Sequence, residues 1–283
     1  MIAVIDIGSN SIRMLLKGKT KEKLSVITKL IENCKDNLLD GAAIERSVKE
    51  VVKFIKMAQD YDADIHIFAT ECLRTAKNSE EFTNKIFDKT GYSIKILSKD
   101  EESTLAFLGA GCGKIGELAV LDIGGGSTEL AYGRGKKISI TKSLPIGAVR
   151  LYDRCKKDRN VLEVEIKNHI KNFKRAAYTN LIGVGGTITS LAALDLNLKK
   201  YDADKVNGHV LKQDGVRKMF ETLITLNDKQ TLKLYGIQKG REKTIAGGCL
   251  LLLKIMELLK ATKITVSESD NLEGFIIFNE IER

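Results

Sequence analysis

The stretch V-L-D-I-G-G-G-S-T, from Val120 to Thr128, decides the fold because an earlier stretch, V-I-D-I-G-S-N-S from Val4 to Ser11, has the same pattern. Each is an apolar run rich in β-branched residues, followed by one Asp and a turn of Gly and Ser. Apolar runs that end in turn residues predict buried strands. Two copies predict two related half-domains, each presenting a carboxylate and a tight polar loop to a shared cleft.

The rest of the chain predicts alternating strands and helices. Up to residue 113 we expect strands at 2–5, 12–16, 24–28, 65–69 and 94–97, and helices at 42–59, 70–89 and 100–110. Asn78 and Glu81 match a capping box that would restart the second of these helices. Later we expect strands at 118–123, 129–132, 136–142, 181–184 and 263–267, and helices at 148–155, 162–178, 185–194, 212–226, 228–234, 241–259 and 272–281.

This order of elements predicts an α/β protein with two domains, mixed sheets and helices on both faces of each sheet. We place the boundary in the glycine-rich segment 109–113, which gives domains at 1–113 and 114–283, and we expect the last helix to pack back on the first domain. No linker is rich in Pro or Ser, so the domains should pack closely. The cleft between them is then the default site for a ligand.

Composition narrows the class of partner. The 283 residues are 43% hydrophobic and carry a formal net charge of +9, which suits a folded protein with a polyanionic partner or a merely lysine-rich surface. The chain has no Trp and its few aromatic residues are not interleaved with basic runs, which argues against nucleic acid binding. We also expect no membrane partner, because the most apolar stretch, 247–259, is short and interrupted by charges.

The five cysteines and three histidines are scattered, with no C-x-x-C pair. A zinc site or a disulfide framework is therefore not expected, and a reducing cytoplasm fits this cysteine usage best. The N-terminus runs directly into the first predicted strand, and we read no signal peptide there.

Four acidic residues are candidates for chemistry. Asp6 and Asp122 each end a buried apolar strand, where a carboxylate is costly unless it caps a turn, is paired or binds a metal. Matching contexts favour Mg²⁺, which takes one or two carboxylates together with water and phosphate oxygens. Glu129 is either a second such acid or a solvent-facing strand residue. Glu102 is either a general base for water or an ordinary acid of a first helical turn, because the capping box of its helix uses its neighbour instead.

Three glycine-containing turns are candidates for phosphate binding, since glycine lets the backbone approach a ligand and successive N–H groups can bind an anion. Each could equally be a simple turn, and neither P-loop nor G-x-G-x-x-G spacing is present. Arg74 and Arg241 are candidate phosphate clamps that the residues alone do not separate from surface arginines. The turns contribute Ser9, Asn10, Gly124, Gly125, Gly126, Ser127, Thr128, Gly185 and Gly186.

Six blocks in order resemble the exopolyphosphatase / guanosine pentaphosphate phosphohydrolase family over essentially the whole chain. They are D-I-G-S-N-S-I-R-M from Asp6, A-T-E-C-L-R-T-A-K-N from Ala69, L-S-K-D-E-E from Leu97, D-I-G-G-G-S-T-E-L from Asp122, L-P-I-G-A-V-R-L from Leu144 and G-V-G-G-T from Gly183. The resemblance implies the actin-like ATPase superfold, with a duplicated ribonuclease H-like domain. It also implies metal-dependent hydrolysis of a terminal phosphoanhydride.

The resemblance implies roles for matching positions. Glu102 is similar to the family's catalytic base, and Asp122 and Glu129 are similar to the acids that hold Mg²⁺ and water. The matching phosphate binders are Asn10, Arg74, Gly125, Gly126, Ser127 and, in a looser match, Arg241. The chain departs from the family at Glu71, where relatives more often have Ser, and at Lys99, where they have Gly. Many relatives also carry a further helical domain, so processive action on long chains is not implied.

These features predict an exopolyphosphatase that uses Mg²⁺, with Mn²⁺ as the alternative, and that acts on inorganic polyphosphate or guanosine pentaphosphate. Three alternatives remain: a phosphotransferase from polyphosphate to ADP, a sensor that binds without turnover, and an actin-like filament module. We expect a homodimer, the commonest oligomer.

Overall fold

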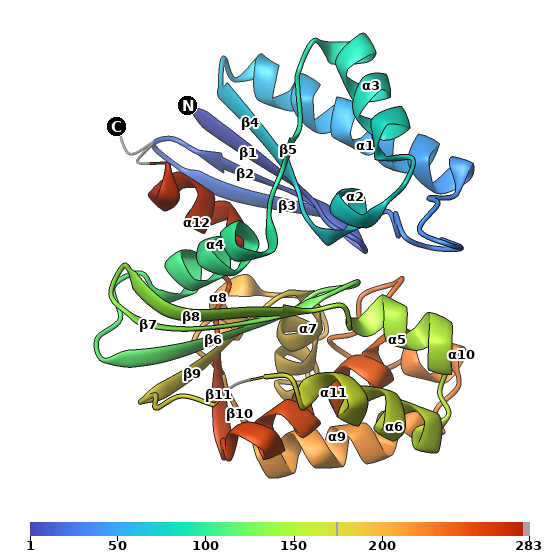
Figure 1. Ribbon diagram of the computed structural model, residues 1–283, viewed down its shortest axis with the longest axis vertical. Helices are drawn as coiled ribbons and strands as arrows, with labels where there is room; N and C mark the ends of the chain where they lie inside the picture. Colours follow the sequence, from blue (N-terminus) through green and yellow to red (C-terminus); the bar gives the residue numbers. More distant parts are fainter. Residues whose placement is uncertain (174, 280–283) are drawn as a thin grey trace.

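The computed structural model describes residues 1–173 and 175–279, which form two lobes with one mixed sheet each (Figure 1). The first sheet has strand order β3-β2-β1-β4-β5 and the second β10-β11-β9-β6-β7-β8. The first contains β1 (Ile2–Ile7), β2 (Ser11–Lys17), β3 (Lys21–Ile27), β4 (Asp64–Ala69) and β5 (Lys95–Ile96). The second contains β6 (Glu117–Ile123), β7 (Thr128–Arg134), β8 (Lys137–Leu144), β9 (Asn180–Val184), β10 (Val210–Lys212) and β11 (Lys263–Val266).

The two sheets repeat one arrangement. Strand β1 pairs antiparallel with β2 and parallel with β4, and β6 pairs antiparallel with β7 and parallel with β9. Strands β1 and β6 are therefore equivalent, and Asp6 and Asp122 occupy equivalent places near their ends. The predicted duplication is confirmed at the level of strand topology.

Helices cover both sheets. The first lobe carries α1 (Gly41–Asp60), α2 (Glu71–Thr75), α3 (Ser79–Thr90) and α4 (Lys99–Gly111). The second carries α5 (Ala148–Cys155), α6 (Arg159–Ile170), α7 (Gly186–Asp195), α8 (Ala203–Val206), α9 (Gln213–Thr225), α10 (Asp228–Thr231) and α11 (Ile245–Leu259), and α12 (Asn271–Phe278) ends the described chain. Apolar side chains of α1 and α3 pack on the first sheet, and those of α11 pack within the core of the second lobe. Within the described ranges, no helix combines the length and apolar character that crossing a bilayer requires.

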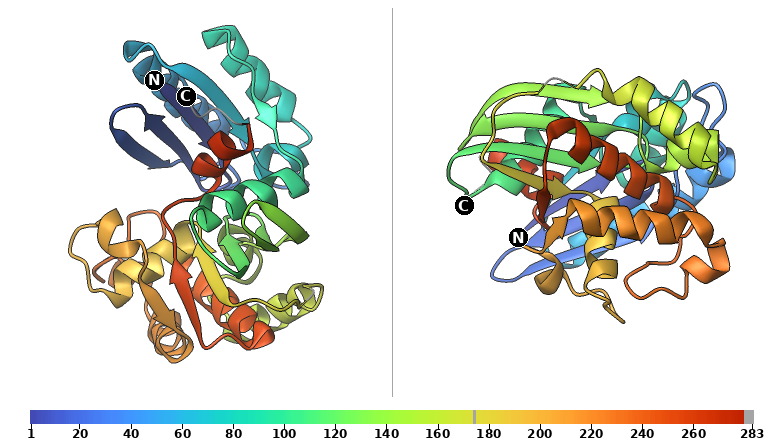
Figure 2. Two further views of the ribbon diagram at one scale, coloured as in Figure 1. Left: turned by 90° about the vertical axis from the view of Figure 1, so that its left-hand side faces the viewer. Right: turned by 90° about the horizontal axis from the view of Figure 1, so that it is seen from below.

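Helix α4 lies between the sheets and belongs to both cores. Its Leu105 packs with Val4 and Phe68 of the first sheet, while its Phe107 packs with Val120 of the second. Helix α12 returns from the second lobe to pack on α4 and β1 (Figures 1 and 2). Because the first turn of α4 also carries Glu102, this double packing sets where that carboxylate lies relative to both lobes.

Glycine permits the close crossing of α4 and α12. A Cβ atom at Gly109 of α4 would lie 1.9 Å from the carbonyl oxygen of Asp270, and one at Gly274 of α12 would lie 1.9 Å from that of Leu105. Larger residues would therefore force the helices apart. These glycines fix the contact that joins the end of the chain to the first lobe.

Several predicted elements need correction. Helix α6 ends at Ile170 instead of 178, because the chain leaves the helix through tight turns while Phe173 stays buried; residue 174 of that prediction lies outside the described residues. Helix α11 begins at Ile245, which leaves Arg241 in a loop, and α10 ends at Thr231. Strand β10 and helix α8 were not predicted, and of the last predicted helix residues 280 and 281 lie outside the described part.

The capping box predicted at Asn78 does not form. Asn78 is the N-cap of α3, but its side chain makes no capping hydrogen bond. Its amide instead accepts from the N–H of Leu39 at 2.9 Å and donates to the carbonyl oxygen of Leu39 at 3.1 Å. A contact between segments far apart in sequence therefore takes the place of the capping hydrogen bonds, and between the two side chains only a 3.5 Å hydrogen bond from the Asn78 amide to the Glu81 carboxylate remains.

Candidate active site

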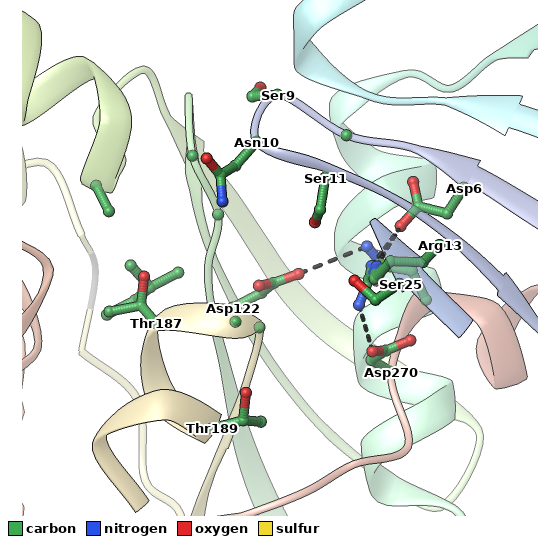
Figure 3. A pocket seen from close by; sticks show the side chains of 18 of the residues that line it. Asp6, Ser9, Asn10, Ser11, Arg13, Ser25, Asp122, Thr187, Thr189 and Asp270 are labelled. Atoms are coloured by element: carbon green, nitrogen blue, oxygen red, sulfur yellow. Dashed lines mark hydrogen bonds and ion pairs between the residues drawn. The ribbon is translucent and has the colours of Figure 1, made fainter. Parts of the chain in front are cut away.

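A cavity of about 380 Å³ lies between the lobes and is lined by residues of both (Figure 3). Three loops reach it: loop 8–11 between β1 and β2, loop 124–127 between β6 and β7, and loop 185–187 from β9 into α7. The predicted site residues that line it are Asp6, Ser9, Asn10, Glu102, Asp122, Gly124, Gly125, Gly126, Ser127, Gly185, Gly186 and Arg241. Of the predicted set, Arg74, Thr128 and Glu129 do not line the cavity.

Loops 8–11 and 124–127 are equivalent hairpin turns that touch across the cleft. Gly8 N–H donates to the Ser11 carbonyl oxygen at 3.1 Å, and Gly124 N–H donates to that of Ser127 at 3.0 Å. A Cβ atom at Gly125 would lie 3.1 Å from the Cβ of Ser9, so the loops are in close contact. Each loop is thus a turn that closes a hairpin and also a wall of the cavity.

Loop 185–187 brings a carboxylate and a guanidinium to the start of α7. Gly185 has φ +90°, and a Cβ atom there would lie 2.4 Å from Asp122 Oδ1. A Cβ atom at Gly186 would lie 2.1 Å from Arg241 Nη2. Burial lowers the pKa of Arg241 to about 10, against an opposing attraction to Tyr201. A partly buried guanidinium next to a helix N-terminus suits an anionic ligand.

Glu102 lies in the first turn of α4, next to a capping box that uses its neighbour. Ser98 and Glu101 form the predicted box, which leaves the Glu102 carboxylate free to accept from Arg74 Nη1 at 2.9 Å. The residue is 5% exposed, and burial raises the pKa of Glu102 to about 8 although Arg74 opposes the shift. A carboxyl with this pKa is poised to exchange protons near neutral pH.

Arg74 reaches the site only through Glu102. The same Nη1 also donates to the carbonyl oxygen of Leu97 at 2.7 Å, while Nε and Nη2 are buried without partners in the described chain. A guanidinium with unused buried donors is costly, and an anion nearby would remove that cost.

Asp122 and Glu129 lie directly opposite each other on β6 and β7. Burial raises the pKa of Asp122 to about 6, opposed by the charge of Arg13. Burial also raises the pKa of Glu129, and the nearby Glu102 and Asp122 raise it further. Glu129 is 2% exposed and accepts from Ser143 Oγ at 2.7 Å, so its alternative interpretation as a solvent-facing residue is wrong.

Asp6 has a different environment from Asp122. Arg13, directly opposite on β2, forms an ion pair with Asp6 and donates from Nε to Asp6 Oδ2 at 3.1 Å. Arg13 also pairs with Asp270, which precedes α12 (Figure 3). Burial raises the pKa of Asp6, and Arg13 opposes the shift. The predicted metal role of Asp6 therefore meets competition from a cation of the protein itself.

The donor set fits Mg²⁺ only in a restricted way. Among the described residues, no group of three or more His, Cys, Asp or Glu side chains is arranged to hold a metal ion. Asp122 and Glu129 nevertheless face each other with raised pKa values and without an Arg or Lys ion pair in the described chain. An ion held by one or two carboxylates, water and substrate oxygens fits these residues. Arg13 occupies Oδ2 of Asp6 and leaves only the buried Oδ1 without a partner in the described chain, so the metal role of Asp6 stays a prediction.

Thr128 was predicted as a hydroxyl for phosphate, but its hydroxyl donates to the carbonyl oxygen of Ile146 at 2.6 Å and the residue is fully buried. It supports loop 124–127 from behind.

Sequence reasoning missed Arg13 and Asp270, which reach the cavity from opposite ends of the chain. Only Arg13 had a signal, because hairpin register places it opposite Asp6.

Comparison with known proteins agrees with this geometry. A sequence profile of the Ppx/GppA phosphatase family matches residues 3–281. A bifunctional 3-dehydroquinate synthase/phosphatase of Fusobacterium nucleatum is 31% identical over 97% of this chain and 46% of that protein. A guanosine-5'-triphosphate,3'-diphosphate pyrophosphatase of Vibrio atlanticus is 28% identical over 97% of this chain and 58% of that protein. The chain thus spans about half the length of these curated relatives.

Solved structures match along almost the whole chain. A PPX-GPPA enzyme of Aquifex aeolicus is 29% identical with a TM-score of 0.81, and covers 98% of each chain. An exopolyphosphatase-like protein is 25% identical with a TM-score of 0.90, and covers 98% of this chain and 97% of its own. The predicted fold class, duplicated ribonuclease H-like domains of the actin-like ATPase superfold, is confirmed.

Proposed function

This chain belongs to the Ppx/GppA phosphatase family, and from that premise we propose that it hydrolyses the terminal phosphoanhydride of inorganic polyphosphate or of guanosine pentaphosphate. One observation carries the proposal: a single cavity between the lobes gathers Glu102, Asp122 and two glycine loops. These are a candidate base, a candidate metal acid and a surface of backbone donors. Phosphoryl transfer depends mainly on positioning and charge stabilisation, which this set can supply.

The terminal phosphate would lie against loops 8–11 and 124–127. Backbone N–H groups of Gly125 and Gly126, the Asn10 amide and the hydroxyl of Ser127 can donate to its oxygens, whereas the Ser9 hydroxyl already donates to Glu71. Arg241 and the N-terminus of α7 lie at another part of the same cavity and would attract the next phosphates of the chain.

The Glu102 carboxylate would orient a water and take its proton as the water oxygen attacks the terminal phosphorus. The bridging P–O bond breaks, and the shortened chain leaves with its charge on the former bridging oxygen. Arg74 stabilises the carboxylate form of Glu102 and so keeps the base available although burial raises its pKa to about 8. A base with a pKa close to the working pH is the most effective proton acceptor.

Asp122 and Glu129 are the residues that would hold Mg²⁺. When bound, the ion supplies positive charge next to the phosphate oxygens that become more negative in the transition state. Glu129 sits behind Asp122 and does not line the cavity, so Asp122 is the acid that would face the substrate.

The proposed base is tested by Glu102→Gln against its matched neighbour Glu101→Gln. We expect Glu102→Gln to lower the rate of phosphate release by roughly 10²–10⁴-fold without weakening polyphosphate binding. Glu101→Gln should keep near wild-type activity, because Gln can replace Glu in a capping box. Phosphate release is measured from each substrate with and without Mg²⁺, and turnover of Glu102→Gln near that of wild type would contradict the role.

The same assay separates the alternative functions. Addition of ADP tests phosphotransfer, since ATP should appear only if the terminal phosphoryl group can pass to a nucleotide. A sensor would bind polyphosphate with no phosphate release in any condition. We expect release in Mg²⁺, no ATP, and little release after chelation.

A further inference from the structure

An ion pair joins the two lobes directly behind the loops of the cavity. Glu71 is the first residue of α2 in the first lobe, and Arg150 lies on α5 in the second. Their side chains are 4% and 21% exposed and form a salt bridge. Neither residue lines the cavity, so the pair would act on a ligand only through what it holds.

Each partner of the pair also holds one of the two touching loops. Arg150 Nε donates to the carbonyl oxygen of Gly126 at 3.0 Å, and its backbone N–H donates to that of Gly125 at 3.1 Å. On the other side, Glu71 accepts from Ser9 Oγ at 3.3 Å. Loop 8–11 and loop 124–127 are therefore tied to one cross-lobe pair.

Glu71 lies so close to loop 124–127 that only glycine fits at position 126. A Cβ atom at Gly126 would lie 2.0 Å from Glu71 Oε2 and 2.8 Å from Ser9 Oγ. The Glu71 carboxylate thus lies against the backbone of the loop that we expect to receive phosphate. A negative charge in this place would repel an anionic ligand unless it were neutralised.

We propose that Glu71 and Arg150 form a positioning pair for the terminal phosphate, an inference that rests on the proposed function. The salt bridge fixes loops 8–11 and 124–127 in one geometry, and Arg150 cancels the carboxylate that lies behind them. The two partners are consequently not equivalent. Loss of Arg150 exposes a negative charge next to the phosphate, whereas loss of the Glu71 charge leaves a positive one.

This asymmetry is the test. Arg150→Met should raise KM for polyphosphate by roughly tenfold or more, the effect of a unit charge several ångströms from an anion at a protein surface. Glu71→Gln keeps the hydrogen-bonding shape without the charge and should leave KM unchanged or lower it. Adding Glu71→Gln to Arg150→Met should restore the part of the affinity lost to the uncompensated carboxylate, while the part lost with the Arg150 bond to Gly126 stays lost.

A matched control lies one turn along the same helix. Arg154 pairs with Glu165 inside the second lobe, so Arg154→Met makes the same chemical change away from the loops and should leave KM unaltered. Melting temperatures of all variants separate loss of fold from loss of affinity. Equal KM changes in Arg150→Met and Glu71→Gln, or no rescue in the double variant, would overturn the proposal.

Binding of polyphosphate by calorimetry is measured on the same variants, because it does not depend on turnover. If the wild type binds polyphosphate but releases no phosphate, the proposed function fails while the binding asymmetry still tests the pair. If the wild type releases phosphate and both single variants bind alike, the positioning pair fails and the proposed function stands.

Discussion

The corner between β1 and β2 and the corner between β6 and β7 are built alike but charged differently. Both present an Asp at the end of a buried strand and a glycine turn closed by the same hydrogen bond. The residue opposite the Asp is Arg13 in the first lobe and Glu129 in the second. One corner thus contains its own cation, whereas the other gathers two carboxylates and depends on a cation from outside.

This difference in charge suits one of the two duplicated corners, the one between β6 and β7, better than the other to bind a metal ion. Arg13 contacts Asp6 and Asp270 directly, Lys23 adds a second cation at Asp270, and Arg13 reaches Asp122 only as a neighbouring charge. The first corner can then serve as a rigid wall, while the raised pKa values of Asp122 and Glu129 mark the second as a place where positive charge is favourable.

Removal of the cation from the first corner should have the largest effect on stability. Arg13→Met leaves Asp6 without its cation and leaves Asp270 with only Lys23, and breaking a buried pair in this way costs about 3–5 kcal/mol of unfolding free energy. Urea unfolding measures it. Arg217→Met, which removes an exposed pair with Glu257, is the control and should cost no more than about 1 kcal/mol. A loss of less than about 1 kcal/mol in Arg13→Met would contradict the conclusion that the first corner depends on its own cation.

The two aspartates should then respond in opposite ways. Asp122→Asn should lower kcat by roughly 10²–10³-fold, the usual cost of losing one group that stabilises transition-state charge. Asp6→Asn should keep most of kcat and instead cost about 1–3 kcal/mol of unfolding free energy, because it removes one partner of Arg13. Steady-state kinetics and urea unfolding of both variants check this, and equal losses of kcat would refute the assigned difference.

Stability of the metal-free protein should depend on pH through Glu102. Its pKa in the folded state is about 8, above the ordinary value of 4.5. The folded state therefore binds this proton more tightly than the unfolded chain. Protonated Glu102 thus adds to the free energy of unfolding below pH 4.5, and this contribution is lost as pH rises towards 8.

Glu102→Gln removes this titration, and melting curves between pH 5 and 8 compare it with the wild type. The variant should gain about 1 kcal/mol or more relative to the wild type over this range. Asp270, whose pKa is lowered by Arg13 and Lys23 against the effect of burial, contributes only in more acidic solution. A difference between variant and wild type that does not change with pH would contradict the assignment.

The smallest effects should come from the turns, which the two corners share. A Cβ atom would lie 3.1 Å from the Ser11 oxygen at Gly8 and 3.2 Å from the Ser127 oxygen at Gly124. Gly8→Ala and Gly124→Ala should each cost about 1 kcal/mol of unfolding free energy. Gly41→Ala, where nothing lies within 4 Å, serves as the control. Unequal losses at Gly8 and Gly124 would show that the turns are not equivalent.

Local sequence patterns predicted the parts that local rules govern. The duplicated strand, Asp and glycine turn follow from apolar runs and turn residues, and the Ser98–Glu101 capping box follows from a fixed spacing. Such patterns failed where distant segments intervened: Asn78 binds Leu39 instead of capping its helix, and Phe173 continues the apolar spacing of α6 beyond the end of that helix.

The sequence by itself determined that two carboxylates and two glycine turns recur in matching places, because strand period and turn chemistry act over a few residues. Hairpin register also places Arg13 opposite Asp6 and Glu129 opposite Asp122, but only the tertiary structure decided which distant charges join them. Asp270 reaches Arg13 across 257 positions, and Glu71 reaches Arg150 across 79. These pairings arise because α12 packs back on α4 and β1 and because α2 of one lobe lies next to α5 of the other, and no local pattern of residues encodes the charge that such packing brings together.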